Sequence, residues 1–175
     1  MANIELFAPF VFKWEGGFAN DPNDKGGPTF RGVTLATWKQ IGYDKDPDGE
    51  ITSSDLRLLN KQEIVNKVLK PLYWDQWHAD QMISQSTANL LVDWVWCSGK
   101  WGIILPQRVM HLLPDGIVGD KTLQAVNSAD PQELFLELQQ RRKEYLENIC
   151  RSRRANSKFL QGWLNRLYDL KFSDL

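Results

Sequence analysis

Apolar residues recur at helical spacing through most of the chain, and no segment shows sustained alternation of apolar and polar residues. One such segment covers residues 3–14. A more strongly apolar one covers residues 85–98, where Asp93 is the only charged residue. A long helix is predicted from Asp130, because Asp-Pro-x-Glu supplies an N-cap, a proline at the first helical position and an acid in the first turn. The pattern therefore predicts a mainly α fold.

Shorter helices are predicted from their capping residues. Thr34 is expected to cap a helix that ends at Gly42. Asn60 and Glu63 form a capping-box pattern for a helix that we expect Pro71 to break. Further helices are expected over residues 106–113, from a cap at Asp120, and over a final apolar stripe with Trp163 and Leu167.

Residues 14–34, WEGGFANDPNDKGGPTFRGVT, interrupt the helical pattern. Glycine permits backbone shapes closed to other residues and proline fixes φ, so five glycines and two prolines predict a folded loop with defined turns. Glu15 stands where the first predicted helix meets this loop. The loop is either a place for chemistry or a surface loop whose acids are simply solvated.

Carboxyl groups in this loop suit glycoside cleavage, which needs one acid to protonate the leaving oxygen and a second group on the other face of the sugar. Glu15, beside Trp14 and Phe18, can be partly desolvated, which favours its proton-bearing form. The other candidates for the catalytic set are Asp24, Asp21 and Thr34. In a polar glycine loop the aspartates are expected to stay ionised, and the threonine hydroxyl could hold a water.

The order W-E-G-G-[FY]-x-N-D-P-x-D-x-G-G-x-T-x-x-G-[VI]-T resembles the signature of the glycoside hydrolase 108 family, the N-acetylmuramidases of phage endolysins and bacterial secretion loci. In that family the Glu of E-G-G is the catalytic acid, so the resemblance implies this role for Glu15. It also implies a lysozyme-like helical domain whose active site is carried by a small loop or hairpin. The implied activity is hydrolysis of the β-1,4 bond between N-acetylmuramic acid and N-acetylglucosamine in peptidoglycan.

The resemblance continues through Tyr-Trp-Asp at residues 73–75 and through D-G-x-x-G-x-x-T at residues 115–122, which is similar to small peptidoglycan-binding modules. It implies a muramidase region over residues 1–99 and a helical peptidoglycan-binding-like region over residues 100–175. The candidates for substrate contact are Trp14, Phe18, Tyr73, Trp74 and Asp93. Their aromatic members could equally be core residues, and a buried aspartate must be paired, which favours a structural role for Asp93.

Residues 44–55, DKDPDGEITSSD, have the order of an EF-hand calcium loop. Asp44, Asp46 and Asp48 occupy its positions 1, 3 and 5, and Gly49 occupies position 6. Position 12 is Asp55, where EF-hands carry a bidentate Glu. The pattern predicts a structural calcium ion, and the alternative is an Asp-Gly turn followed by a helix cap. No cofactor is expected for catalysis.

The charge and composition of the chain limit the kinds of partner that we expect. The formal net charge is −1, which gives no general attraction to nucleic acid or anionic membranes. No apolar run approaches the length of a membrane span, so no membrane insertion is expected. Of the two cysteines, Cys97 is expected to pack as a small apolar residue, and a bridge to Cys150 is left open.

The first residues lack the basic segment and cleavage site of a signal peptide. We therefore expect synthesis in the cytoplasm and action in the periplasm or on the cell wall, reached through a holin-like pore or a dedicated secretion route. Two alternatives to a muramidase remain open. One is a lytic transglycosylase, which needs one Glu but no water, and the other is a wall-binding protein without turnover that assists secretion.

Overall fold

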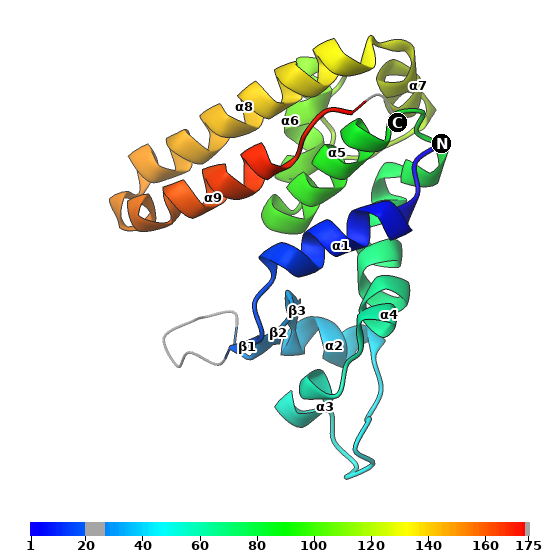
Figure 1. Ribbon diagram of the computed structural model, residues 1–175, viewed down its shortest axis with the longest axis vertical. Helices are drawn as coiled ribbons and strands as arrows, with labels where there is room; N and C mark the ends of the chain where they lie inside the picture. Colours follow the sequence, from blue (N-terminus) through cyan, green and yellow to red (C-terminus); the bar gives the residue numbers. More distant parts are fainter. Residues whose placement is uncertain (20–26, 174–175) are drawn as a thin grey trace. The chain divides into compact units, whose positions relative to one another are not determined.

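The structure is a computed structural model that describes residues 1–19 and 27–173 (Figure 1). Helices make up most of the described residues, and the sheet found among them has three short strands. No helix in these two ranges is both long enough and apolar enough to cross a membrane. The chain divides into two compact units, Ile4–Leu72 and Tyr73–Leu175, and the second of these also includes Met1–Asn3.

The unit Ile4–Leu72 begins with a helix that leads into the sheet. Strands β1 and β2 pair antiparallel with Phe18 opposite Phe30, and β2 pairs with β3 with Phe30 opposite Val33. The mainly α fold and the small hairpin predicted for the glycine-rich loop are therefore confirmed. The elements of this unit are α1 (Ile4–Trp14), β1 (Phe18–Ala19), β2 (Thr29–Phe30), β3 (Val33–Thr34), α2 (Leu35–Ile41), α3 (Ser53–Arg57) and α4 (Lys61–Ile64).

Local capping residues set the ends of these helices. Thr34 caps α2 by accepting a hydrogen bond from the Thr37 backbone N–H at 3.0 Å, and Gly42 is the C-cap, as predicted. Asn60 and Glu63 make both hydrogen bonds of the capping box that begins α4. The predicted break at Pro71 is wrong, because a π-helix, η1 (Val65–Trp74), continues through it. In the wider π turn the proline ring avoids the carbonyl that it would meet in an α-helix.

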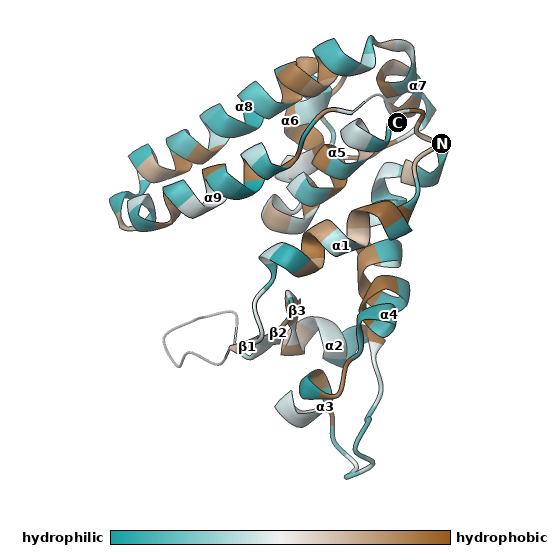
Figure 2. Cartoon of the chain, viewed as in Figure 1, coloured by the Kyte–Doolittle hydropathy of each residue, from teal (hydrophilic) through white to brown (hydrophobic). Residues whose placement is uncertain are grey.

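Helices are the only regular elements found among the described residues of the second unit. Its long helix α8 contacts α5, α6 and α9. Figure 2 shows mainly hydrophilic residues along the visible side of α8 and hydrophobic stretches on α6. The elements are η2 (Asp75–Trp77), η3 (Ala79–Gln81), α5 (Gln85–Ser98), α6 (Trp101–Val109), α7 (Asp120–Ser128), α8 (Pro131–Ser152), η4 (Arg154–Asn156) and α9 (Ser157–Asp169).

A glycine allows α5 and α6 to approach closely. A Cβ atom on Gly102 would lie 2.4 Å from the backbone nitrogen of Val95, so no larger residue fits there without movement of the backbone. The predicted helix over residues 106–113 has the wrong bounds, since α6 already begins at Trp101. Helix α6 ends just before His111, which adopts a left-handed φ of 56°, and the Leu112 N–H donates to the Gln107 carbonyl, a Schellman-type ending.

Two further predictions are wrong, one about the N-cap of α7 and one about the burial of Cys97. The N-cap of α7 is Gly119, and Asp120 is its first helical residue. Cys97 is exposed rather than packed in the core, although its thiol lies 3.9 Å from Asp93 Oδ2 on the preceding turn of α5; Cys150 is the buried cysteine. The two cysteines do not form a disulfide with each other. The predicted start of α8 is confirmed, with Asp130 accepting hydrogen bonds from two backbone N–H groups of the first turn.

Candidate active site

Glu15 lies directly after α1, at the point where the chain turns towards the sheet. Its backbone N–H donates to the Val11 carbonyl at 2.9 Å, so the helix hydrogen-bonding pattern extends to this residue. Phe7 and Val11 are fully buried and fix the helix that carries it. Glu15 itself is half-buried. The arrangement holds one carboxyl group at a fixed position next to a small sheet.

The aromatic neighbours of Glu15 are half-buried and come from the helix end and from β1. The Trp14 ring has the Lys13 ammonium 5.8 Å from its centre. The Phe18 ring has the Arg57 guanidinium only 3.7 Å from its centre, a contact between β1 and α3. Since Arg57 covers one face of Phe18, a sugar could stack only on the other face. Nothing in the local sequence pattern signals the Arg57 contact.

Of the other residues predicted to be catalytic, the structure describes Thr34 but not Asp21 and Asp24. The Thr34 hydroxyl caps α2 and lies 2.9 Å from the Thr37 hydroxyl, so it has structural partners. A catalytic role for Thr34 stays a prediction. Asp21 and Asp24 lie in residues 20–26, outside the described part of the chain.

Two aromatic candidates for substrate contact lie at the start of the second unit. The Tyr73 ring is half-buried, with its centre 4.6 Å from that of Trp96. Trp74 is fully buried, and its indole N–H donates to Asp80 Oδ1 at 2.7 Å. These contacts give both rings structural partners, and substrate binding by them stays a prediction.

Asp93 is fully buried on α5 and is bound by two arginines. Its Oδ2 accepts a hydrogen bond from Nη2 of Arg142 on α8 at 2.8 Å. Its Oδ1 accepts from Nη2 and Nε of Arg166 on α9, at 2.8 and 3.1 Å. The expected pairing of this aspartate is confirmed, and direct contact with substrate stays a prediction. The two arginines were missed, although Arg142 interrupts a run of buried apolar residues on α8 at Leu138 and Leu146.

A cavity of about 150 Å³ adjoins this ion cluster. Arg142, Arg166, Tyr145 and Trp163 line it, together with the exposed Cys97. Burial raises the pKa of the Tyr145 phenol, although a hydrogen bond with Ser98 and the charge of Arg142 act in the opposite direction. Arginine forks bind carboxylates and aromatic faces stack on sugars, so the cavity has the chemistry to accept an anionic or saccharide group.

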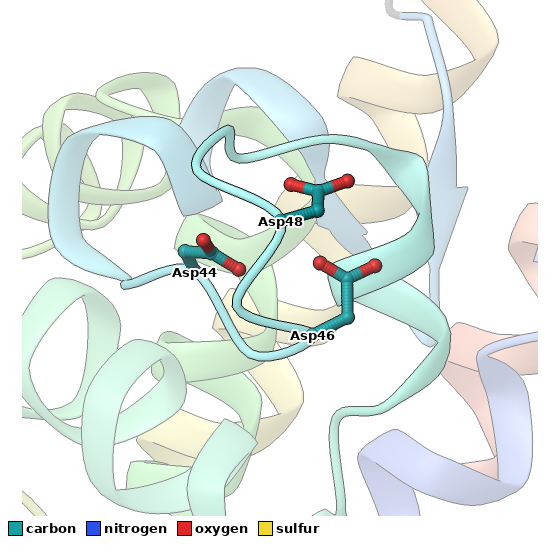
Figure 3. A group of neighbouring side chains, drawn as sticks. All are labelled: Asp44, Asp46 and Asp48. Carbon is teal, nitrogen blue, oxygen red and sulfur yellow. The ribbon is translucent and has the colours of Figure 1, made fainter.

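The acidic loop brings together three of its four predicted metal ligands (Figure 3). One oxygen from each of Asp44, Asp46 and Asp48 lies within 4.8 Å of the others. Burial and the neighbouring carboxylates of Asp48, Asp55 and Asp44 raise the pKa of Asp46. Asp55 is not part of the cluster, because its two oxygens accept hydrogen bonds from the backbone N–H groups of Lys45 and Thr52. Burial alone would raise the pKa of Asp55, but its backbone donors lower it.

A mainly helical fold in which a helix and a small sheet flank one fixed carboxyl group defines a lysozyme-like protein. The model of the family described as Glycosyl hydrolase 108 matches residues 8–99, more than half of the chain. The model of a predicted peptidoglycan domain matches residues 101–168. The chain therefore belongs to the glycosyl hydrolase 108 family, and it is a glycoside hydrolase whose substrate is peptidoglycan.

Comparison with solved structures agrees with this assignment. The structure of Brucella abortus SagA matches with a TM-score of 0.76 at 26% sequence identity, over 96% of this chain and 92% of that one. A search of curated proteins gave no significant match. The two family matches meet near residue 100, whereas the compact units divide at Leu72 and Tyr73. The predicted domains, residues 1–99 and 100–175, stay a prediction.

Proposed function

We propose that this chain is an N-acetylmuramidase, which hydrolyses the β-1,4 bond between N-acetylmuramic acid and N-acetylglucosamine, and that Glu15 is its proton donor. The position of Glu15 carries the proposal. It is the half-buried acid at the junction of α1 and the sheet, inside the segment that matches the hydrolase family. A general acid must be held at a fixed position relative to the glycosidic oxygen, and a helix end supplies that rigidity.

In the proposed reaction Glu15 gives its proton to the leaving oxygen as the glycosidic bond breaks. An ionised aspartate of the glycine-rich loop, Asp24 or Asp21, together with Thr34, directs a water to the sugar carbon or stabilises the oxocarbenium-like transition state. Water adds its hydroxyl to the carbon, and its remaining proton returns the catalytic carboxyl groups to their starting states. The reaction uses the chain's own groups and water, without a cofactor.

Because peptidoglycan lies outside the cytoplasm, we also propose that the enzyme acts in the periplasm or on the wall. A holin-like pore or a dedicated secretion route would then be its export partner. Comparing wall lysis by intact cells with and without such a pore, at equal amounts of the enzyme, tests this part separately. Equal lysis without any pore or secretion route would contradict it.

The decisive experiment replaces Glu15 by glutamine, which keeps the size of the side chain and removes its acid. Turbidity loss of purified peptidoglycan is expected to fall by at least about a hundredfold, the usual contribution of a general acid. Glu50→Gln is the matched control, because it makes the same change at an exposed glutamate of the same unit. Circular dichroism and thermal melting show whether both variants keep the wild-type fold.

Mass spectrometry of the released fragments identifies the reaction. A muramidase leaves a reducing N-acetylmuramic acid end, whereas a lytic transglycosylase leaves an anhydro end that is lighter by one water. A folded Glu15→Gln variant with wild-type activity would contradict the role of Glu15. Anhydro ends would overturn the hydrolytic mechanism, and binding of peptidoglycan without any turnover would leave a wall-binding protein.

A further inference from the structure

We propose that Asp44, Asp46 and Asp48 bind one calcium ion, which stabilises residues 44–55 in their folded form. This inference concerns an ion site away from the chemistry of Glu15, and it does not depend on the proposed muramidase activity. The three carboxylates come from one short segment between α2 and α3 and lie beside one another in Figure 3. One oxygen of each lies within 4.8 Å of the others, which is close enough for all three to contact a single cation.

The strongest indication of a bound cation is that two carboxylate oxygens are buried without a hydrogen-bond partner. Oδ1 of Asp44 and Oδ1 of Asp46 each expose less than 1 Å² to solvent and have no hydrogen-bond partner. A buried anionic oxygen without a donor is unfavourable, because it has lost its hydration and gained nothing in return. Both belong to the carboxylates that converge here, so a bound cation is the partner that satisfies them.

Among the described residues, no basic side chain forms an ion pair with Asp44, Asp46 or Asp48. Lys45 is the only basic residue within residues 43–55, and its ammonium forms an ion pair with Glu63 of α4. The Tyr43 hydroxyl donates to the same Glu63 Oε1 at 2.9 Å. The residues that flank the first ligand are therefore fixed to α4, and the negative charges of Asp44, Asp46 and Asp48 are left for a cation from solution.

The segment shares with an EF-hand loop the glycine turn at position 6. Gly49, at position 6, has a φ of 97°, which only glycine adopts readily. Its N–H donates to Asp44 Oδ2 at 2.7 Å, which orients the carboxylate at position 1. Asp48 Oδ1 accepts from the Glu50 N–H at 2.9 Å. The loop is thus held in shape by hydrogen bonds that leave the two buried Oδ1 atoms unused.

The ligand chemistry favours calcium. Hard carboxylate oxygens suit Ca²⁺ and Mg²⁺, but Ca²⁺ accepts six to eight oxygens in flexible geometry, whereas Mg²⁺ requires a near-ideal octahedron. A backbone carbonyl at position 7, which is Glu50, and waters on the exposed side of Asp48 would complete the shell. Since Asp55 at position 12 is bound to backbone N–H groups instead, we expect weak affinity, with a dissociation constant on the order of 10⁻⁵ to 10⁻³ M.

The experiment uses the full chain after treatment with a chelator that is then removed. Calcium binding is measured by calorimetry, and terbium binding by luminescence excited through the aromatic rings beside the loop. Trp38 and Tyr43 serve as antenna, because their ring centres are 5.9 Å apart and Tyr43 directly precedes Asp44. We expect one ion per chain, displacement of terbium by calcium, and little displacement by an equal concentration of magnesium.

Asp46→Asn is the diagnostic variant and Glu50→Gln its control, since each removes one negative charge from the same loop and Glu50→Gln keeps the backbone carbonyl at position 7. Asp46→Asn is expected to weaken calcium binding by at least about tenfold, and Glu50→Gln to change it by less than about twofold. In melting experiments calcium should raise the Tm of the wild type and of Glu50→Gln, but not that of Asp46→Asn. With chelator present, Asp46→Asn should melt at or above the wild type, because repulsion between the carboxylates is relieved.

The order of the Tm values of Asp46→Asn and the wild type, compared with and without calcium, distinguishes an ion site from a purely structural aspartate. If Asp46 only supported the loop, Asp46→Asn would melt below the wild type with and without calcium. Absence of terbium or calcium binding up to about ten millimolar, beyond the weakest range expected for such loops, would overturn the proposal. Equal loss of binding in Asp46→Asn and Glu50→Gln would also overturn it, because it would show only a general effect of charge. Magnesium binding as tight as calcium binding would refute the choice of ion.

Discussion

Asp93 lies fully buried between Arg142 and Arg166, and replacing it by asparagine is expected to destabilise the chain strongly. Asparagine has nearly the same shape, so the change leaves no cavity and removes chiefly the negative charge. The side chain of Arg142 is 3% exposed and that of Arg166 is 12% exposed. Arg142 therefore cannot turn into water to recover its hydration, and its charge would stay buried without its carboxylate.

The expected magnitude follows from this burial. Removing one partner of a buried ion pair costs about 3–5 kcal/mol, because the remaining charge is left uncompensated. The upper part of that range applies here, since two guanidinium groups lose the same carboxylate. For a domain of this size 1 kcal/mol corresponds to about 2–4 °C in Tm, so a loss of about 4–5 kcal/mol should lower the Tm by about 8–20 °C.

Urea unfolding followed by tryptophan fluorescence and circular dichroism gives the free energy of unfolding directly. Asp120→Asn, at an exposed aspartate on α7, is the control and should change it by less than about 1 kcal/mol. In the double variant Asp93→Leu with Arg142→Met, both buried charges of that pair are gone. It should be more stable than Asp93→Leu alone, because no uncompensated charge remains on α8.

A loss below about 1 kcal/mol for Asp93→Asn would refute the reasoning, since it would mean that the arginines find water or other partners in the folded state. A double variant less stable than Asp93→Leu alone would refute the explanation by uncompensated charge. In that case the packing of the Arg142 side chain would be the larger contribution.

Three further predictions concern the same unit. Gly102→Ala should lower the free energy of unfolding by about 1–3 kcal/mol in urea titration, because the new Cβ would meet the backbone of Val95; a neutral result would show that α5 and α6 can separate. Asp130→Ala should cost about 0.5–2 kcal/mol through loss of the α8 N-cap, whereas Asp130→Asn should be nearly neutral. A backbone hydrogen bond from Ile117 and the Gln107 side chain lower the pKa of Asp115. Its stabilising contribution is therefore present above the ordinary value of 3.8 and is lost as pH falls below it, so acid titration of Asp115→Asn should show a weaker loss of stability than the wild type.

The features that the sequence predicted correctly depend on near neighbours in the chain. The cap at Asp130 and the capping box of Asn60 with Glu63 involve residues within one helical turn, so their hydrogen bonds follow from the order of residues alone. The same holds for Asp44, Asp46 and Asp48, whose alternate positions in one short loop bring their carboxylates together. In these cases chain connectivity already limits the distance between the interacting groups.

The features that the sequence could not give depend on which distant helices meet. Asp93 finds its partners 49 and 73 positions along the chain, and no local pattern states which arginines those are. Cys97 was expected in the core because its neighbours are apolar, but the packing of α5 leaves it exposed. The sequence by itself determined most of the helices, the caps at Thr34, Asn60 and Asp130, and the acid at the end of α1. Only the tertiary structure decided which charges are buried together, because that depends on desolvation by residues remote in sequence.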